Sequence, residues 1–214
     1  MDLKKRNEDM RVFFNEKAEG YDDVHMKMIK NKDRITELMP EDTCRVLDLG
    51  AGTGLELISL YERFPEARVT AIDISENQLK MLEKRPFADK MQLVCGDFFD
   101  TDFGGGYDAV ISSAALHHFD EPEKRVLYKK IFDCLKSGGV FINSDRVLDT
   151  YEQQLDNFEL FRTDPTHWRH FDTPLALCRE ETLLTETGFR SFRHEVLPQG
   201  EYYMLTYVRK PGEK

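Results

Sequence analysis

The sequence lacks any long apolar run. No stretch approaches the roughly 20 consecutive apolar residues that a membrane-spanning helix needs, so we expect no membrane span. The first eleven residues are rich in charge and contain no apolar core of the kind that secretory signal peptides carry. We therefore predict a cytoplasmic protein without a membrane partner.

Cysteine and positive charge are both scarce. The 30 Lys and Arg residues against 40 Asp and Glu give a formal net charge of −10. A chain of this charge repels nucleic acid and anionic membranes, so we expect no nucleic-acid partner, although a local basic patch would still permit RNA binding. The cysteines are far apart and show no CxxC pair or metal-ligand spacing. We expect them to be buried, reduced thiols: Cys44, Cys95, Cys134 and Cys178.

The sequence does contain a regular alternation of strands and helices. Its 214 residues suit one domain over residues 1–214. Short apolar runs predict buried strands at 45–49, 68–73, 91–95, 107–112 and 140–143. Helical spacing and start and stop signals predict helices at 55–64, 75–85, 121–135 and 175–187. This alternation implies a doubly wound parallel sheet with helices on both faces.

The two ends of the chain and one internal segment depart from this alternation. Residues 189–197 and 202–208 flank a Pro-Gln-Gly-Glu turn, which predicts an antiparallel hairpin and a sheet of seven strands. Residues 1–39 are charged and helical in pattern. Residues 145–173 are long, irregular and rich in aromatics, as in a lid or substrate cap that follows a strand.

A glycine-rich turn after the first predicted strand is the strongest motif. Residues 46–54 read VLDLGAGTG, and glycines at such a turn let a ligand approach the backbone closely. The spacing is GxGxG rather than the GxGxxG of dinucleotide folds. Asp48 lies two positions before Gly50, where a carboxylate opposes a pyrophosphate but suits a ligand with an ammonium group. Both features disfavour a nicotinamide-dependent dehydrogenase.

Polar residues also follow the next three predicted strands. Asp73 ends the second strand, where a carboxylate can accept hydrogen bonds from ribose hydroxyls. Ile74 next to it offers an apolar surface to a purine ring. Asp97 follows the third strand and can accept from an exocyclic amine. The fourth strand ends at Ser113 and leads into Leu-His-His-Phe at residues 116–119.

This order of motifs resembles the class I S-adenosylmethionine-dependent methyltransferases over about residues 13–208. A Ser-Gly-Gly turn at 137–139 is similar to the family's Pro-Gly-Gly turn, with serine in place of proline. The resemblance implies a Rossmann-like fold, S-adenosylmethionine as cofactor, and an N-terminal helical lid formed by residues 1–39. It implies cofactor contacts, including a lid contact from the tyrosine, by Asp48, Gly50, Gly52, Asp73, Ile74, Asp97, Phe98, Ser113 and Tyr21.

Within these contacts, the resemblance places the two loop glycines and Ser113 at the methionine part of the cofactor. Asp48 orients the amino group, directly or through water. Asp73 accepts hydrogen bonds from both ribose hydroxyls. Asp97 and the backbone N–H of Phe98 form hydrogen bonds with the adenine.

Methyl transfer is an in-line displacement that needs alignment, and a neutral acceptor also needs a base. The histidines offer base candidates: His118 and His117 near the cofactor, and His167 in the cap. Trp168, His170 and Tyr151 of the cap are predicted to bind the acceptor. No metal is expected, because neighbouring histidines on a loop point apart.

We thus expect a methyltransferase for a small-molecule acceptor, acting as a monomer or homodimer. One alternative is a tRNA-modifying enzyme, because the chain has a loose similarity to enzymes that make or use carboxylated S-adenosylmethionine for wobble-uridine modification. Another is a non-catalytic S-adenosylmethionine-binding module, since intact acidic residues argue for binding rather than for turnover.

Overall fold

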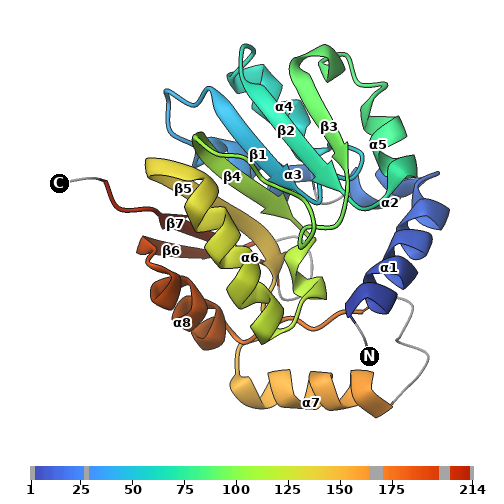
Figure 1. The fold of residues 1–214 in the computed structure, drawn as a ribbon, viewed down its shortest axis with the longest axis vertical. Coiled ribbons are helices and arrows are strands. Elements are labelled where there is room, and N and C mark those ends of the chain that lie inside the picture. The colour runs from blue at the N-terminus through green and yellow to red at the C-terminus, as the bar shows by residue number, and fades with distance from the viewer. Residues whose placement is uncertain (1–2, 27–28, 164–170, 198–202, 213–214) are drawn as a thin grey trace.

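Seven strands form one mixed sheet through the centre of the molecule (Figure 1). The structure is a computed structural model that describes residues 3–26, 29–163, 171–197 and 203–212. The strands are β1 (Arg45–Leu49), β2 (Arg68–Asp73), β3 (Met91–Cys95), β4 (Tyr107–Ser113), β5 (Leu135–Arg146), β6 (Arg190–Val196) and β7 (Tyr203–Arg209).

The strand order is β3-β2-β1-β4-β5-β7-β6. The first five strands run parallel, and β7 is antiparallel to both β5 and β6. The predicted seven-stranded sheet with an antiparallel C-terminal pair is therefore confirmed, while the predicted turn at 198–201 lies outside the described residues. The chain order reverses between β1 and β4, and ligands of open α/β sheets bind outside the carboxyl ends of the strands at such a point.

Helices cover both faces of this sheet. Buried side chains of α3, α4 and α5 pack on one face, and those of α6 and α8 pack on the other. In Figure 1, α1 lies beside α5, and α7 stands apart from the sheet. The helices are α1 (Leu3–Lys17), α2 (Tyr21–His25), α3 (Ile29–Glu37), α4 (Glu56–Arg63), α5 (Glu76–Leu82), α6 (Glu121–Cys134), α7 (Tyr151–Thr163) and α8 (Leu177–Thr187).

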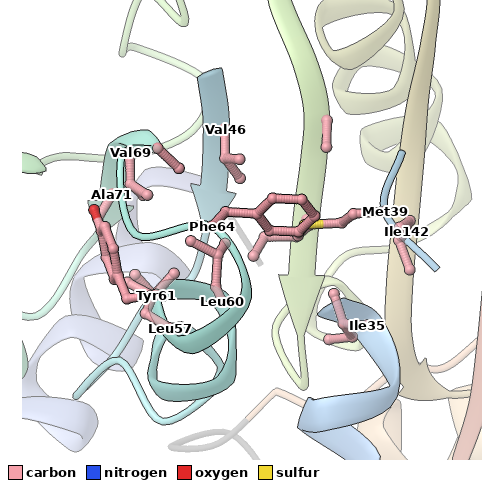
Figure 2. Packing of buried hydrophobic residues seen from close by; sticks show 14 of the residues in the cluster. Ile35, Met39, Val46, Leu57, Leu60, Tyr61, Phe64, Val69, Ala71 and Ile142 are labelled. Carbon is pink, nitrogen blue, oxygen red and sulfur yellow. The ribbon is translucent and has the colours of Figure 1, made fainter. Parts of the chain in front are cut away.

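The core beneath α3 and α4 shows how this packing follows from the sequence (Figure 2). The helical spacing of Leu57, Leu60 and Phe64 puts all three on one side of α4, where they meet alternate residues of β1 and β2 such as Val46 and Val69. This packing fixes the start of α4, and with it the glycine-rich turn that leads from β1 into the helix.

The structure corrects the prediction for residues 145–173. Instead of being irregular throughout, the segment begins with the end of β5 and then forms α7. Thr150 Oγ accepts from the backbone N–H of Gln153 (3.2 Å), and Gln153 Oε1 accepts from the backbone N–H of Thr150 (3.1 Å). This reciprocal capping box is a helix-start signal that the sequence contains. β5 also starts earlier than predicted, at Leu135, because a bulge against β4 takes up the Ser-Gly-Gly turn.

The predicted burial of the cysteines is wrong for three of four. Only Cys134 is buried, while Cys44, Cys95 and Cys178 are exposed, and all four are free thiols. Cys44 precedes β1, Cys95 ends the edge strand β3, and Cys178 lies in the first turn of α8. In the described part of the chain, no helix is long and apolar enough to cross a bilayer.

Candidate functional site

A cavity opens outside the carboxyl ends of the central strands, where the chain order reverses. It encloses about 680 Å³ when its open mouth is included, within the range of sites for small molecules and cofactors. It is lined by residues from α1, α2 and α5 and from the ends of β1 to β4 with the segments that follow them: Asn7, Met10, Phe14, Tyr21, Gly50, Gly52, Asp73, Ile74, Gln78, Gly96, Asp97, Phe98, Ser113, Ala114, Ala115, His118 and Phe119.

The glycine-rich turn forms the floor of this cavity. Gly50 and Gly52 have φ angles of +77° and +52°, which favour glycine. A Cβ at Gly50 would lie 2.4 Å from the Cβ of Ala115, and one at Gly52 would lie 2.6 Å from Oε1 of Gln78. A side chain at either position would therefore clash with a neighbouring side chain of the cavity wall, so the turn keeps this close packing only with glycine.

Asp73 lies beside this turn at the end of β2. Its carboxylate accepts from the backbone N–H groups of Gly52 (2.8 Å) and Ser75 (2.7 Å). Burial raises the pKa of Asp73 to about 6, although these two N–H groups act in the opposite direction. Ile74 and Gln78 line the wall next to it. This wall combines one carboxylate with an apolar surface, as a ribose next to a base requires.

The end of β3, which is the neighbour of β2 in the sheet, provides a further part of the wall. Asp97 accepts from the backbone N–H of Phe99 (2.9 Å) and from Nδ2 of Asn7 on α1 (2.6 Å). The ring of Phe98 is buried against Phe119, with 5.8 Å between ring centroids. Asp97 therefore lines the cavity and also binds α1 through Asn7.

Helices α1 and α2 cover the cavity, and side-chain hydrogen bonds and an ion pair hold them in place. Asn15 Oδ1 accepts from the hydroxyl of Ser75 at 2.8 Å. Asp22 of α2 pairs with Arg85 at 2.6 Å and accepts from the hydroxyl of Thr53 at 2.5 Å. Tyr21 lines the cavity, and burial raises the pKa of its hydroxyl above the usual range.

A buried cluster of charge lies behind the glycine-rich turn. Asp48 is fully buried and is not part of the cavity wall, and no donor among the described residues forms a hydrogen bond to either of its carboxyl oxygens. Lys32 of α3 donates to Glu56 of α4 (2.7 Å) and to the hydroxyl of Ser113 (3.0 Å), which does line the cavity. Burial and the neighbouring carboxyl of Glu56 raise the pKa of Asp48 well above its usual range.

The two histidines after β4 have different surroundings. His118 lines the cavity, and its Nδ1 donates to the carbonyl of Phe171 at 2.5 Å. The neutral ring then carries its acceptor lone pair on Nε2. His117 lies behind the wall and donates through Nδ1 to the buried carboxylate of Asp145. Ala114, which lies in the chain between the end of β4 and the two histidines, has a φ of +55°, a conformation that non-glycine residues rarely adopt.

Of the predicted cap residues, which are the acceptor-binding candidates Trp168, His170 and Tyr151 and the base candidate His167, the structure describes only Tyr151. His167, Trp168 and His170 lie at 164–170, outside the described residues. Tyr151 begins α7 and is 48% exposed, with Arg179 5.9 Å from its ring centroid. It is not part of the cavity wall.

Sequence reasoning missed several polar residues that the structure brings to the site. Lys32, Asn7 and Asp145 approach from elements far away along the chain, and no local pattern marks them. Glu56 and Gln78 follow the predicted motifs closely, so a charged or amide side chain in the first turn of each helix was an available signal.

Comparisons with known proteins agree with this geometry. Residues 46–139 match the family model described as a methyltransferase domain. The malonyl-[acyl-carrier protein] O-methyltransferase of Acetivibrio thermocellus is 31% identical over 211 residues, which cover 94% of this chain and 74% of that protein. The chain belongs to the class I S-adenosylmethionine-dependent methyltransferase family. S-adenosylmethionine is its cofactor.

Other relatives match over a shorter part of their length. The carboxy-S-adenosyl-L-methionine synthase of Campylobacter fetus is 32% identical over 122 residues, 55% of this chain and 51% of that protein. The chain likewise spans 52% of a malonyl-[acyl-carrier protein] O-methyltransferase from Priestia megaterium. Human N-acetylserotonin methyltransferase in complex with SAM shares the fold, with a TM-score of 0.69 at 19% identity over 92% of this chain and 56% of that one.

The residues present fit this cofactor. Gly50 and Gly52 line the cavity without a side chain, so a ligand can approach their backbone, and Asp73 offers a carboxylate beside them. The unpartnered oxygens of Asp48 lie behind the floor, where a cationic donor would satisfy them.

Proposed function

We propose that this methyltransferase transfers a methyl group to a small-molecule acceptor. The observation that carries the proposal is that one covered cavity has the glycine turn as its floor and His118 in its wall. S-adenosylmethionine supplies a sulfonium methyl group that is open to in-line attack. The acidic charge of the chain further supports a small molecule over RNA.

The proposed cofactor roles follow the walls of the cavity. Asp73 accepts from the ribose hydroxyls, with Ile74 beneath the purine. Asp97 and the backbone N–H of Phe98 form hydrogen bonds with the adenine. The backbone of the glycine turn, Ser113 and Tyr21 enclose the methionine end, and Asp48 compensates its ammonium charge.

The proposed base is His118. Its Nδ1 proton is used in the hydrogen bond to Phe171, so Nε2 is the atom that takes a proton from a hydroxyl acceptor. His117 supports it from behind the wall. Residues 171–173 connect to both histidines, because the backbone N–H of Thr173 donates to the carbonyl of His117 at 2.8 Å. We propose that the preceding cap residues His167, Trp168 and His170, with Tyr151, contribute to acceptor binding or catalysis.

A labelled-methyl experiment tests the proposal. The protein is incubated with methyl-labelled S-adenosylmethionine and one of three acceptor pools: hydroxylated aromatics, malonyl thioesters, or total tRNA. Label in a small molecule, lost in Asp73→Ala, supports the proposal. Label only in tRNA favours the tRNA-modifying alternative, and tight cofactor binding without label in any pool favours the non-catalytic module.

The identity of the acceptor also decides whether a base is needed. A hydroxyl must lose a proton during transfer, whereas the carboxylate of a malonyl group is already ionised at neutral pH. A variant that lacks the imidazole of His118 should therefore lose turnover with a hydroxyl acceptor and keep most of it with a malonyl thioester.

A further inference from the structure

The charge cluster behind the glycine-rich turn contains more carboxyl groups than cations. This excess of negative charge indicates which kind of ligand it binds. Asp48, Glu56 and Lys32 are all buried, so two carboxyl groups share one ammonium group in a dry place. Three of their oxygens receive no hydrogen bond from a donor in the described part of the chain: both of Asp48 and Oε1 of Glu56. With both carboxyls ionised the cluster would carry an uncompensated buried charge, which is strongly unfavourable.

Other groups around Asp48 do not remove this excess. Asp73 of β2 adds a further acidic group, and its charge acts on Asp48 in the same direction as that of Glu56. The phenol groups of Tyr21 in α2 and Tyr61 in α4 lie within electrostatic range of Glu56 and Asp48, respectively, and both are neutral. Lys32 is the only cation that the described residues place in this cluster. The charge of Asp73 is met by the backbone N–H groups of Gly52 and Ser75. For the remaining three groups, Asp48, Glu56 and Lys32, one additional positive charge, whether a proton or a ligand cation, gives neutrality.

We propose that Asp48 and Glu56 share one proton when no cofactor is bound, and that the α-ammonium group of the cofactor replaces this proton on binding. Lys32 is a positioning residue that holds Glu56 and Ser113 in place for this exchange. The inference rests on the cofactor placement proposed above, because Ser113 connects the cluster to the cavity at the methionine end.

The exchange is electrically balanced. Before binding, one neutral carboxyl, one carboxylate and the Lys32 ammonium sum to zero. After binding, two carboxylates, Lys32 and the ligand ammonium again sum to zero, and the proton leaves to solvent. Burial and Glu56 raise the pKa of Asp48, which agrees with a protonated carboxyl in the free protein.

Calorimetric titration with S-adenosylhomocysteine tests the exchange without turnover. It is carried out at pH 7.5 in buffers of different ionisation enthalpy. Asp73 has a pKa of about 6 and releases almost no proton at that pH. We expect the observed enthalpy to change with the buffer by an amount equal to about one proton released per ligand bound.

Glu56→Gln is the decisive variant, because its single remaining carboxyl, Asp48, can ionise beside Lys32 without a shared proton. We expect proton release close to zero. Glu180→Gln is the matched control: Glu180 pairs with Lys124 between α8 and α6, both are buried, and neither lines the cavity. It should keep the proton release of the parent.

Binding to the parent without buffer dependence overturns the inference, and this result needs no variant to fold. Equal proton release in Glu56→Gln also overturns it. A parent that does not bind S-adenosylhomocysteine at all contradicts the cofactor placement instead, so the two failures are distinguishable.

Discussion

His117 and Asp145 join the turn after β4 to the end of β5 through a buried hydrogen bond from Nδ1 to the carboxylate. The same carboxylate accepts from the backbone N–H groups of Leu116 (2.9 Å) and His117 (3.0 Å). Three donors of one short turn thus converge on one acceptor. Because His118 follows directly, Asp145 positions a histidine of the cavity that it does not itself contact.

We expect Asp145→Asn to reduce the free energy of unfolding by about 1–3 kcal/mol, because an amide cannot replace a carboxylate that accepts from these three donors and from the backbone N–H of Arg146. Urea unfolding measures the change. Asp133→Asn is the control, since Asp133 makes an exposed pair with Lys129 on α6 and should change stability by less than about 0.5 kcal/mol. Equal effects of the two substitutions would contradict the role of Asp145.

The same pair predicts a pH dependence. Burial acts to raise the pKa of Asp145, but His117, Lys124 and the backbone N–H of Arg146 outweigh it and hold the pKa below its usual range. A carboxyl group with a lower pKa in the folded protein stabilises the fold at pH values above its pKa in the unfolded protein, which is about 4. This stabilisation is lost as the pH falls through the pKa of the group in the folded protein. We expect the stability difference between parent and Asp145→Asn to be constant from about pH 7 to 5 and to shrink below about pH 4. A difference that persists in strong acid argues against an ionised Asp145.

Asp73→Ala should weaken S-adenosylmethionine binding by about 1.5–3 kcal/mol, the range for hydrogen bonds to a charged group. Because burial raises the pKa of Asp73 to about 6, the parent should also bind more weakly below about pH 6, as the carboxylate takes up a proton. Calorimetry from pH 5 to 8 measures both effects. Unchanged affinity in a folded Asp73→Ala protein would rule out the ribose role.

Gly50→Ala should abolish measurable cofactor binding, because its Cβ would lie 2.4 Å from that of Ala115 at a φ of +77°. Gly138→Ala is matched for backbone strain, with a φ of +78° and no atom within 4 Å of the added Cβ. It should cost about 1–2 kcal/mol of stability and leave binding unchanged. Similar binding by both variants would mean that the turn can widen without loss.

His118→Gln should lower kcat with a hydroxyl acceptor by about 10²–10⁴-fold and remove the ionisation of the base from the pH–rate profile. Its affinity for S-adenosylmethionine should stay within about twofold. His194→Gln on β6 is the control, because His194 contacts Thr206 and Glu181 and is not part of the cavity wall. A pH–rate profile that is unchanged in His118→Gln would show that transfer needs no base from this residue.

Much of the fold follows from local features of the sequence. Apolar runs of four to six residues mark the parallel strands, and caps such as Asp120 with Glu123 mark helix starts, because both depend on neighbours along the chain. The glycine turn, Asp73 and Asp97 were predictable for the same reason. Each follows directly after a strand, and the carboxyl ends of parallel strands meet at one edge of the sheet.

The tertiary structure decided which distant residues complete the site. Asn7 meets Asp97, Lys32 meets Glu56, and His117 meets Asp145 only because different elements pack on the same edge of the sheet. A residue's burial depends on this packing as well, which is why Cys95 was mistaken for a core residue on an edge strand. Periodicity records the environment of one element, whereas charge balance in a buried cluster depends on every element that contributes a side chain to it. The excess of carboxyl groups around Asp48 can therefore be recognised only once α3, β1 and α4 have packed together.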